Sequence, residues 1–275
     1  MALEEIPPPV EETKPQLEAV PPPLEEVKPR PGVWEGWPTV GLSAAILFVF
    51  FTAQSLVAII FLVVLFLRNP ALDSFSQLQD FIIGLQSNGL MLSTAIIASG
   101  ICGYFMVWLF IKLRHGASFK DYLELNAPGK KTWVSLVGVI LLLIIFSAVM
   151  DRIHSDPQSL ETMVAAYLSS GWTPLFWIAT VVFAPVFEET LFRGFLFVGL
   201  RNSRVGPAWT VIITAVTFAF LHSLQYDFFS LMAILVLGLV FGLVRLFTKS
   251  LWSTIALHSA WNLMTMISLA MYIRG

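Results

Sequence analysis

The stretch Val186–Leu200, VFEETLFRGFLFVGL, places Glu188, Glu189 and Arg193 inside an apolar run that extends over about residues 174–200. A helix of this length is long enough to cross a bilayer, which takes ~20 residues. Charged side chains are rare in such helices because burying them in hydrocarbon is costly. The stretch therefore predicts a membrane-spanning helix whose ionisable groups face the interior of the protein.

Further apolar runs surround this one. The run Gly41–Leu67 contains no charged residue, and others follow at about 89–111, 133–150, 207–225, 228–247 and 251–272. The stretch 72–88 is amphipathic and is either a helix at the membrane surface or an eighth span. Hydrophobic residues make up 57% of the chain and charged residues only 12%, against roughly 25% charged in soluble domains. The fold class predicted is all-α, a polytopic transmembrane helical bundle of seven to eight spans.

The N-terminal segment 1–38 is acidic and rich in proline. It repeats a short pattern, IPPPVEETKP at Ile6–Pro15 and VPPPLEEVKP at Val20–Pro29. Proline triplets favour polyproline II, and such a composition cannot bury enough apolar surface to fold. We expect a disordered tail whose residues 1–35 make few contacts with the helices, with a docking motif for a proline-recognising partner as the alternative.

Basic residues are unevenly distributed between the loops, and this asymmetry predicts the orientation. Arg68, Arg152 and Arg274 lie on one face of the predicted bundle. The other face carries Lys112, Arg114, Lys120, Lys130, Lys131, Arg201, Arg204, Arg245 and Lys249. Loops rich in Lys and Arg remain in the cytoplasm, so we expect a cytoplasmic N-terminus. No secretory signal peptide is expected, because the first apolar run begins only after about forty residues.

Two other predicted spans also contain polar residues. His222 follows Phe218 by one helical turn, and His258 and Asn262 are four residues apart, which places them on one helix face. At 1.5 Å per residue, Glu188 lies ~20 Å, His222 ~23 Å and His258 ~13 Å from the cytoplasmic ends of their helices. We therefore predict that Glu188, His222, His258 and Asn262 converge around one water-accessible cavity within the membrane.

The two neighbouring glutamates are expected to behave differently. Glu189 and Arg193 are at i,i+4 spacing, so they can form an ion pair within one helix. Glu188 points about 100° away around the same helix. It has no opposite charge at helical spacing and needs partners from other helices.

Three chemistries can use this set of residues. A carboxylate and an imidazole can activate water while other groups stabilise an oxyanion, as in a peptidase. Alternatively, Glu188, His222 and His258 are possible zinc ligands, although the sequence has no HExxH motif and its single cysteine, Cys102, excludes a thiolate cluster. Finally, buried carboxylates and imidazoles can relay protons in a transporter, but no paired inverted halves are evident.

The motifs Glu188-Glu189-xxx-Arg193, Phe218-xxx-His222 and His258-xxx-Asn262 together resemble the family of CAAX proteases and bacteriocin-processing enzymes (CPBP). The resemblance covers roughly residues 130–272. This family includes the type II CAAX prenyl endopeptidases.

The resemblance implies a role for each motif residue and a division of the chain. Glu188 and His222 would activate water, His258 and Asn262 would stabilise the tetrahedral intermediate, and Glu189, Arg193 and Phe218 would support the site. Family members of this kind look like glutamate-type endopeptidases that need no metal, so no cofactor is expected. The chain would comprise the tail 1–38, N-terminal transmembrane helices 39–128 and a catalytic core 129–275.

The substrate expected is a membrane-associated protein or peptide, with the lipid bilayer as the other partner and no nucleic acid. The absence of a signal peptide and the short loops look bacterial, which indicates the inner (plasma) membrane. Bacteria generally do not prenylate CAAX proteins, so a prenylated substrate is not expected. The alternative from another class is a non-catalytic membrane scaffold or regulator that keeps these residues for structural reasons.

Overall fold

The computed structural model describes residues 32–68 and 75–275, and these residues form helices and no strand. Five helical segments are long and apolar enough to cross a membrane, which confirms an all-helical, multi-pass membrane fold. They are α1 (Trp37–Arg68), α3 (Gly89–Leu113), α5 (Lys130–Ile153), the continuous segment Thr173–Arg201 and α11 (Phe228–Thr248).

The remaining two predicted spans differ from these five. Helix α10 (Gly206–Leu221) is apolar but has only 16 residues, or ~24 Å at 1.5 Å per residue, against a hydrocarbon core of ~30 Å. Helix α12 (Leu251–Arg274) is long enough, but His258, Asn262 and its serines and threonines make it less apolar than the five. The count of seven to eight spans therefore stays a prediction.

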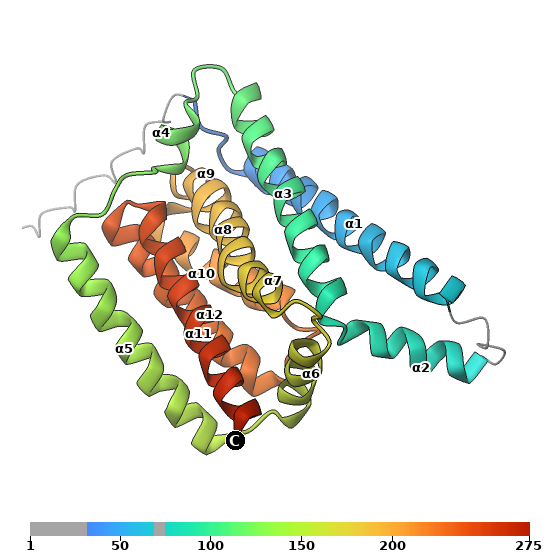
Figure 1. The fold of residues 1–275 in the computed structure, drawn as a ribbon. Coiled ribbons are helices and arrows are strands. Elements are labelled where there is room, and N and C mark those ends of the chain that lie inside the picture. The colour runs from blue at the N-terminus through green and yellow to red at the C-terminus, as the bar shows by residue number, and fades with distance from the viewer. Residues whose placement is uncertain (1–31, 69–74) are drawn as a thin grey trace, which may run out of the picture.

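Three short helices connect the long ones: α2 (Phe75–Gln86), α4 (Phe119–Leu123) and α6 (Pro157–Leu168). Helix α2 lies in the amphipathic stretch, and its twelve residues are too few to cross a bilayer. It lies beyond the lower ends of α1 and α3 and connects them (Figure 1). This arrangement favours the surface helix over the eighth span.

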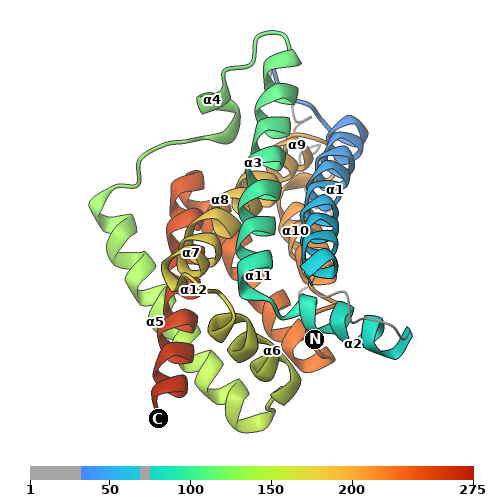
Figure 2. The same cartoon turned by 45° about the vertical axis from the view of Figure 1, so that its right-hand side comes forward.

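The centre of the bundle is the segment Thr173–Arg201. It consists of α7 (Thr173–Ile178), the π-helix η1 (Ala179–Phe183), α8 (Ala184–Glu189), the π-helix η2 (Thr190–Leu196) and α9 (Phe197–Arg201). Its most apolar window is 44% buried, against 11% for α1 and for α5. Helices α1 and α3 cover one side of it, and α5, α11 and α12 lie on the other (Figures 1 and 2). The predicted span that carries charges is thus the innermost helix.

Small residues bring the outer helices close to this centre. A Cβ added at Gly103 of α3 would lie 2.2 Å from the ring of Phe187, and one added at Gly199 would lie 2.5 Å from the carbonyl oxygen of Trp34. Close approach at small residues is the usual way in which helices pack in lipid.

The folded part of the chain begins earlier than predicted. Val33 is buried, and the indole Nε1 of Trp34 donates to the carbonyl of Phe110 at 2.9 Å. The expected tail boundary at residue 38 was therefore wrong, because these two large apolar side chains pack against the bundle. The rest of the predicted tail, residues 1–31, lies outside the described residues.

The ends of the helices agree with the predicted alternation. The C-terminal ends of α3, α9 and α11 and the N-terminal end of α5 lie at one end of the molecule, together with α4 (Figure 1). These segments carry the basic residues assigned to one face. Which of the two ends faces the cytoplasm stays a prediction.

Candidate active site

The glutamate pair lies between two π-helical segments. Glu188 and Glu189 end α8, with η1 before that helix and η2 directly after it. A π-helix forms i→i+5 hydrogen bonds, is rare, and is found frequently at functional sites. The two segments turn the side chains around this helix away from the positions that a regular α-helix would give them.

The ion pair predicted between Glu189 and Arg193 is confirmed. Nη1 of Arg193 lies 3.0 Å from Oε1 of Glu189, and both side chains are 0% exposed. Nη2 of Arg193 donates to the carbonyl of Gly238 in α11 at 3.0 Å. The guanidinium of Arg193 therefore balances the charge of Glu189 inside the protein and also links the central segment to α11.

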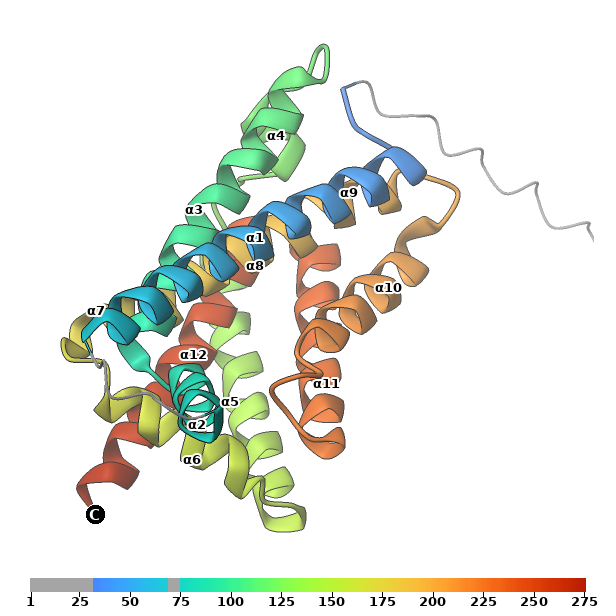
Figure 3. The same cartoon turned by 90° about the vertical axis from the view of Figure 1, so that its right-hand side faces the viewer.

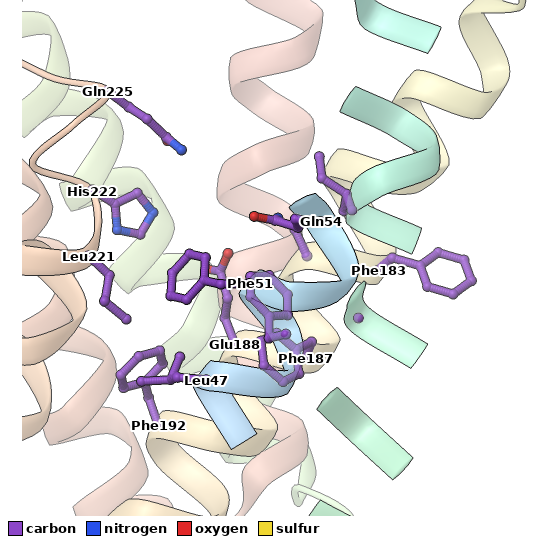
Figure 4. A pocket seen from close by; sticks show the side chains of 14 residues that line it. Leu47, Phe51, Gln54, Phe183, Phe187, Glu188, Phe192, Leu221, His222 and Gln225 are labelled. Carbon is purple, nitrogen blue, oxygen red and sulfur yellow. The ribbon is translucent and has the colours of Figure 1, made fainter. Parts of the chain in front are cut away.

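Glu188 faces a cavity of about 170 Å³ that opens between α1, α3, the central segment and the end of α10. Figure 3 shows α1 crossing in front of α8 and α9, with α10 below them, and Figure 4 shows Glu188 and His222 facing the same space. Its polar lining also includes Gln54 and Gln225. The apolar lining is Leu47, Phe50, Phe51, Ile96, Gly100, Phe183, Ala184, Phe187, Phe192 and Leu221. The volume is enough for several water molecules, and the four polar side chains can hold them.

His222 lies at the end of a helix and not within one. It is the C-cap of α10, and an irregular segment follows until Asp227 caps α11. The predicted helix 207–225 was therefore too long. The ring Nδ1 is 2.8 Å from the carbonyl of Phe218. A carbonyl only accepts, so Nδ1 carries the hydrogen, and in the neutral imidazole Nε2 is an acceptor.

His258 links the two glutamates. Its Nδ1 is 2.9 Å from Oε1 of Glu189, and its Nε2 is 3.7 Å from Oε2 of Glu188. The side chain is buried and is not part of the cavity wall. It lies behind Glu188, with Phe241 at 5.1 Å between ring centroids.

Asn262 is one helical turn further along α12. Its Nδ2 donates to the carbonyl of Thr180 in η1 at 2.9 Å, and it is not part of the cavity wall either. His258 and Asn262 are each turned toward a partner on the central segment, so they do not form part of the cavity wall as Glu188 and His222 do. That all four side chains converge around one cavity stays a prediction.

Phe218 lies at the centre of these groups. The guanidinium carbon of Arg193 is 4.7 Å from the centroid of the Phe218 ring, and the rings of His222 and His258 are 4.7 Å and 5.9 Å away. A cation over an aromatic face is attracted by its quadrupole. The ring thus separates the buried ion pair from His222.

A second buried ionic cluster was missed by the sequence reasoning. Arg245 of α11 and Arg201 of α9 both bind the carboxylate of Glu124, at 2.7 Å and 2.6 Å. Arg245 is 0% exposed, although it was assigned to a loop. Its position inside the apolar run 228–247 is the signal that could have identified it, because charges within such runs are rare.

The residues considered as zinc ligands do not form a metal-binding group. Across the described ranges, 32–68 and 75–275, no three His, Cys, Asp or Glu side chains are placed to hold one ion. His222 and His258 each bond one ring nitrogen to another partner, and this leaves the second nitrogen of each ring available, so the expectation that no metal is needed stays a prediction.

Fold and site together define a multi-pass membrane protein with a carboxylate and an imidazole facing one largely apolar cavity inside the helical bundle. Residues 170–264 match the family model described as type II CAAX prenyl endopeptidase Rce1-like. This match confirms the predicted resemblance, and it includes all three motifs. No curated protein and no solved structure matches the chain.

Proposed function

We propose that this protein is an intramembrane endopeptidase of the glutamate type, in which Glu188 and His222 activate a water molecule. The observation that carries the proposal is that these two side chains, from different helices, line the same cavity. Nε2 of His222 is free of the helix carbonyl that holds Nδ1, so it can accept a proton or a hydrogen bond from water.

The reaction follows from these positions. Glu188 takes a proton from the water, whose oxygen attacks the carbonyl carbon of the scissile peptide bond. The tetrahedral intermediate collapses when the C–N bond breaks, and the proton held by Glu188 passes to the leaving amine. One carboxylate therefore serves first as general base and then as general acid.

Stabilisation of the oxyanion is assigned to His258 and Asn262. Neither side chain forms part of the cavity wall, so this role requires the bound substrate to open the wall toward them. Nδ1 of His258 is bound to Glu189, so Nε2 donates only when the imidazole is doubly protonated. The amide of Asn262 has a second N–H beyond the one that Thr180 accepts. Donors of this kind stabilise the intermediate where charge develops.

The test replaces Glu188 by Gln in the full chain and compares membrane peptides from cells that express each form. A matched control, Glu161→Gln, makes the same change on the exposed face of α6. We expect the cleavage products to disappear with Glu188→Gln alone, at equal expression and thermal stability. Products that persist would favour the scaffold or regulator.

A chelator arm addresses the zinc alternative. We expect cleavage by the purified protein to be unchanged after exhaustive treatment with a strong chelator. Activity that is lost and then restored by stoichiometric zinc would replace the metal-free mechanism. The same peptide comparison tests the expectation that the substrate is a membrane-associated protein or peptide that is not prenylated.

A further inference from the structure

Arg245 holds three acceptors from two other parts of the chain. Its Nε donates to the carbonyl of Arg193 at 2.8 Å, Nη1 to Oε2 of Glu124 at 2.7 Å, and Nη2 to the carbonyl of Leu123 at 3.1 Å. The planar guanidinium can serve such divergent acceptors at once, which the ammonium of lysine does poorly. A fully buried arginine with these three hydrogen bonds holds the two segments that it binds in fixed positions relative to α11.

The acceptor of main interest is the carbonyl of Arg193, because it belongs to η2. This π-helical segment follows the glutamate pair directly, and its backbone sets how Glu188 and Glu189 are turned. A π-helix is less favourable than an α-helix, so a bond from a neighbouring helix to one of its carbonyls favours the unusual geometry.

A continuous series of contacts then leads from Arg245 to the site. The side chain of Arg193 binds Glu189 at 3.0 Å, and Glu189 binds Nδ1 of His258 at 2.9 Å. The other ring nitrogen of His258 lies 3.7 Å from Glu188. Moving the Arg193 backbone would therefore change the placement of both Glu188 and His258.

We propose that Arg245 is a positioning residue for this site: by binding the Arg193 carbonyl it holds η2 in the geometry that directs Glu188 toward the cavity. The proposal rests on the proposed function for its effect on cleavage, but its structural part can be tested independently.

The competing explanation is that Arg245 only neutralises Glu124. Arg201 distinguishes the two explanations, since it binds the same carboxylate at 2.6 Å and, within the part of the chain that the structure describes, forms no hydrogen bond to η2. Arg201→Lys is therefore the matched control for Arg245→Lys. Both substitutions retain the positive charge.

The first readout is hydrogen–deuterium exchange of the backbone amides in residues 186–196, measured on the full chain in detergent. We expect faster exchange in Arg245→Lys and wild-type exchange in Arg201→Lys. Equal exchange in both variants and the wild type would overturn the proposal. This measurement needs no substrate, so it stands whether or not the protein is a protease.

The second readout is kinetic and uses the peptide whose cleavage depends on Glu188. We expect kcat to fall roughly 10- to 100-fold in Arg245→Lys, since small misplacements of reacting groups cost that much, while KM stays within about twofold because the apolar side chains that line the cavity are not substituted. An equal loss in Arg201→Lys would mean that charge balance alone matters and would overturn the proposal. Continued cleavage by Glu188→Gln would instead overturn the proposed function.

A second pair of variants covers the case in which Arg245→Lys does not fold. Glu124→Gln keeps Arg245 and its bond to Arg193, whereas Glu124→Gln with Arg245→Met removes both charges and avoids an unpaired buried carboxylate. We expect fast exchange in 186–196 only in the double variant. Equal exchange in the single and the double variant would overturn the role of Arg245.

Discussion

The two ends of α11 carry opposite charges in very different surroundings. Asp227 caps the N-terminal end, accepts from the backbone of Ser230 at 2.8 Å and pairs with His154. The side chain of Asp227 is 37% exposed and that of His154 is 31% exposed. Arg245 in the last turn is 0% exposed and binds three acceptors. Both signs suit the helix dipole. At the exposed N-terminal end, water can replace a partner that Asp227 loses. At the buried C-terminal end it cannot, so the stability of that end depends on every partner of Arg245.

The largest effect is expected for a pair that is buried on both sides, and Arg193→Met tests this limit. The variant leaves the carboxylate of Glu189 with the imidazole of His258 but without its guanidinium partner, and with no exposure to water. Removing one partner of a buried ion pair costs about 3–5 kcal/mol. The check is the free energy of unfolding in detergent. If Arg193→Met lowers the free energy of unfolding by less than Glu124→Gln does, burial does not determine which ion pair contributes more to stability.

A double variant, Glu189→Leu with Arg193→Met, serves as the control. It should regain much of the stability, because no charge remains buried without a partner. Cleavage should stay absent, since Nδ1 of His258 loses its acceptor. Recovery of both properties would contradict a role for Glu189 in holding His258.

Glu124→Gln is expected to have an intermediate effect, about 1.5–3 kcal/mol, as is usual for hydrogen bonds to charged groups. Burial acts to raise the pKa of the Glu124 carboxyl, but the hydrogen bonds and charges of Arg201 and Arg245 outweigh it and hold the pKa below its ordinary value. A carboxyl with a lowered pKa in the folded state stabilises the protein above its unfolded pKa. This contribution is lost as the pH falls through the folded pKa.

The wild type should therefore lose more stability than Glu124→Gln when the pH is lowered from 7 to below about 4. The measurement is the melting temperature of both proteins across this range. Parallel curves would show that Glu124 is not the carboxyl responsible.

His154→Ala at the exposed end should have the smallest effect. Water can solvate Asp227 once the imidazole is gone, and Asp227 still caps α11 through Ser230. We expect a smaller change in melting temperature than for Glu124→Gln, and one that shrinks further at high salt because exposed charges are screened. A large change in melting temperature that does not depend on salt would show that the exposed end of α11 depends on its partner as strongly as the buried end does.

Most of the helices and one ion pair could be predicted from the sequence, because they depend on local patterns. Apolar runs located the long helices, and the i,i+4 spacing located the bond between Glu189 and Arg193. The polar positions on three helices were found because charges and imidazoles are rare in such runs.

The missed features depend on contacts between distant segments. The bond between Arg245 and Glu124 joins residues 121 positions apart, and no spacing rule predicts it. The π-helical segments could not be predicted from the sequence, because their residues are the same types that form regular α-helices in membranes. The end of α10 at His222 was missed for a related reason, since the polar residues Ser223 and Gln225 after it were read as part of the apolar run 207–225.

The shortness of α10 has a consequence for the lipid around it. A helix of 16 residues spans ~24 Å, less than the thickness of the hydrocarbon layer, and a bilayer meets such a segment by thinning locally. The thinning falls beside the irregular segment that begins at His222, where exposed polar backbone requires water or protein partners. We therefore expect water to have a shorter path through the acyl chains to the cavity beside α10 than beside the five longer segments.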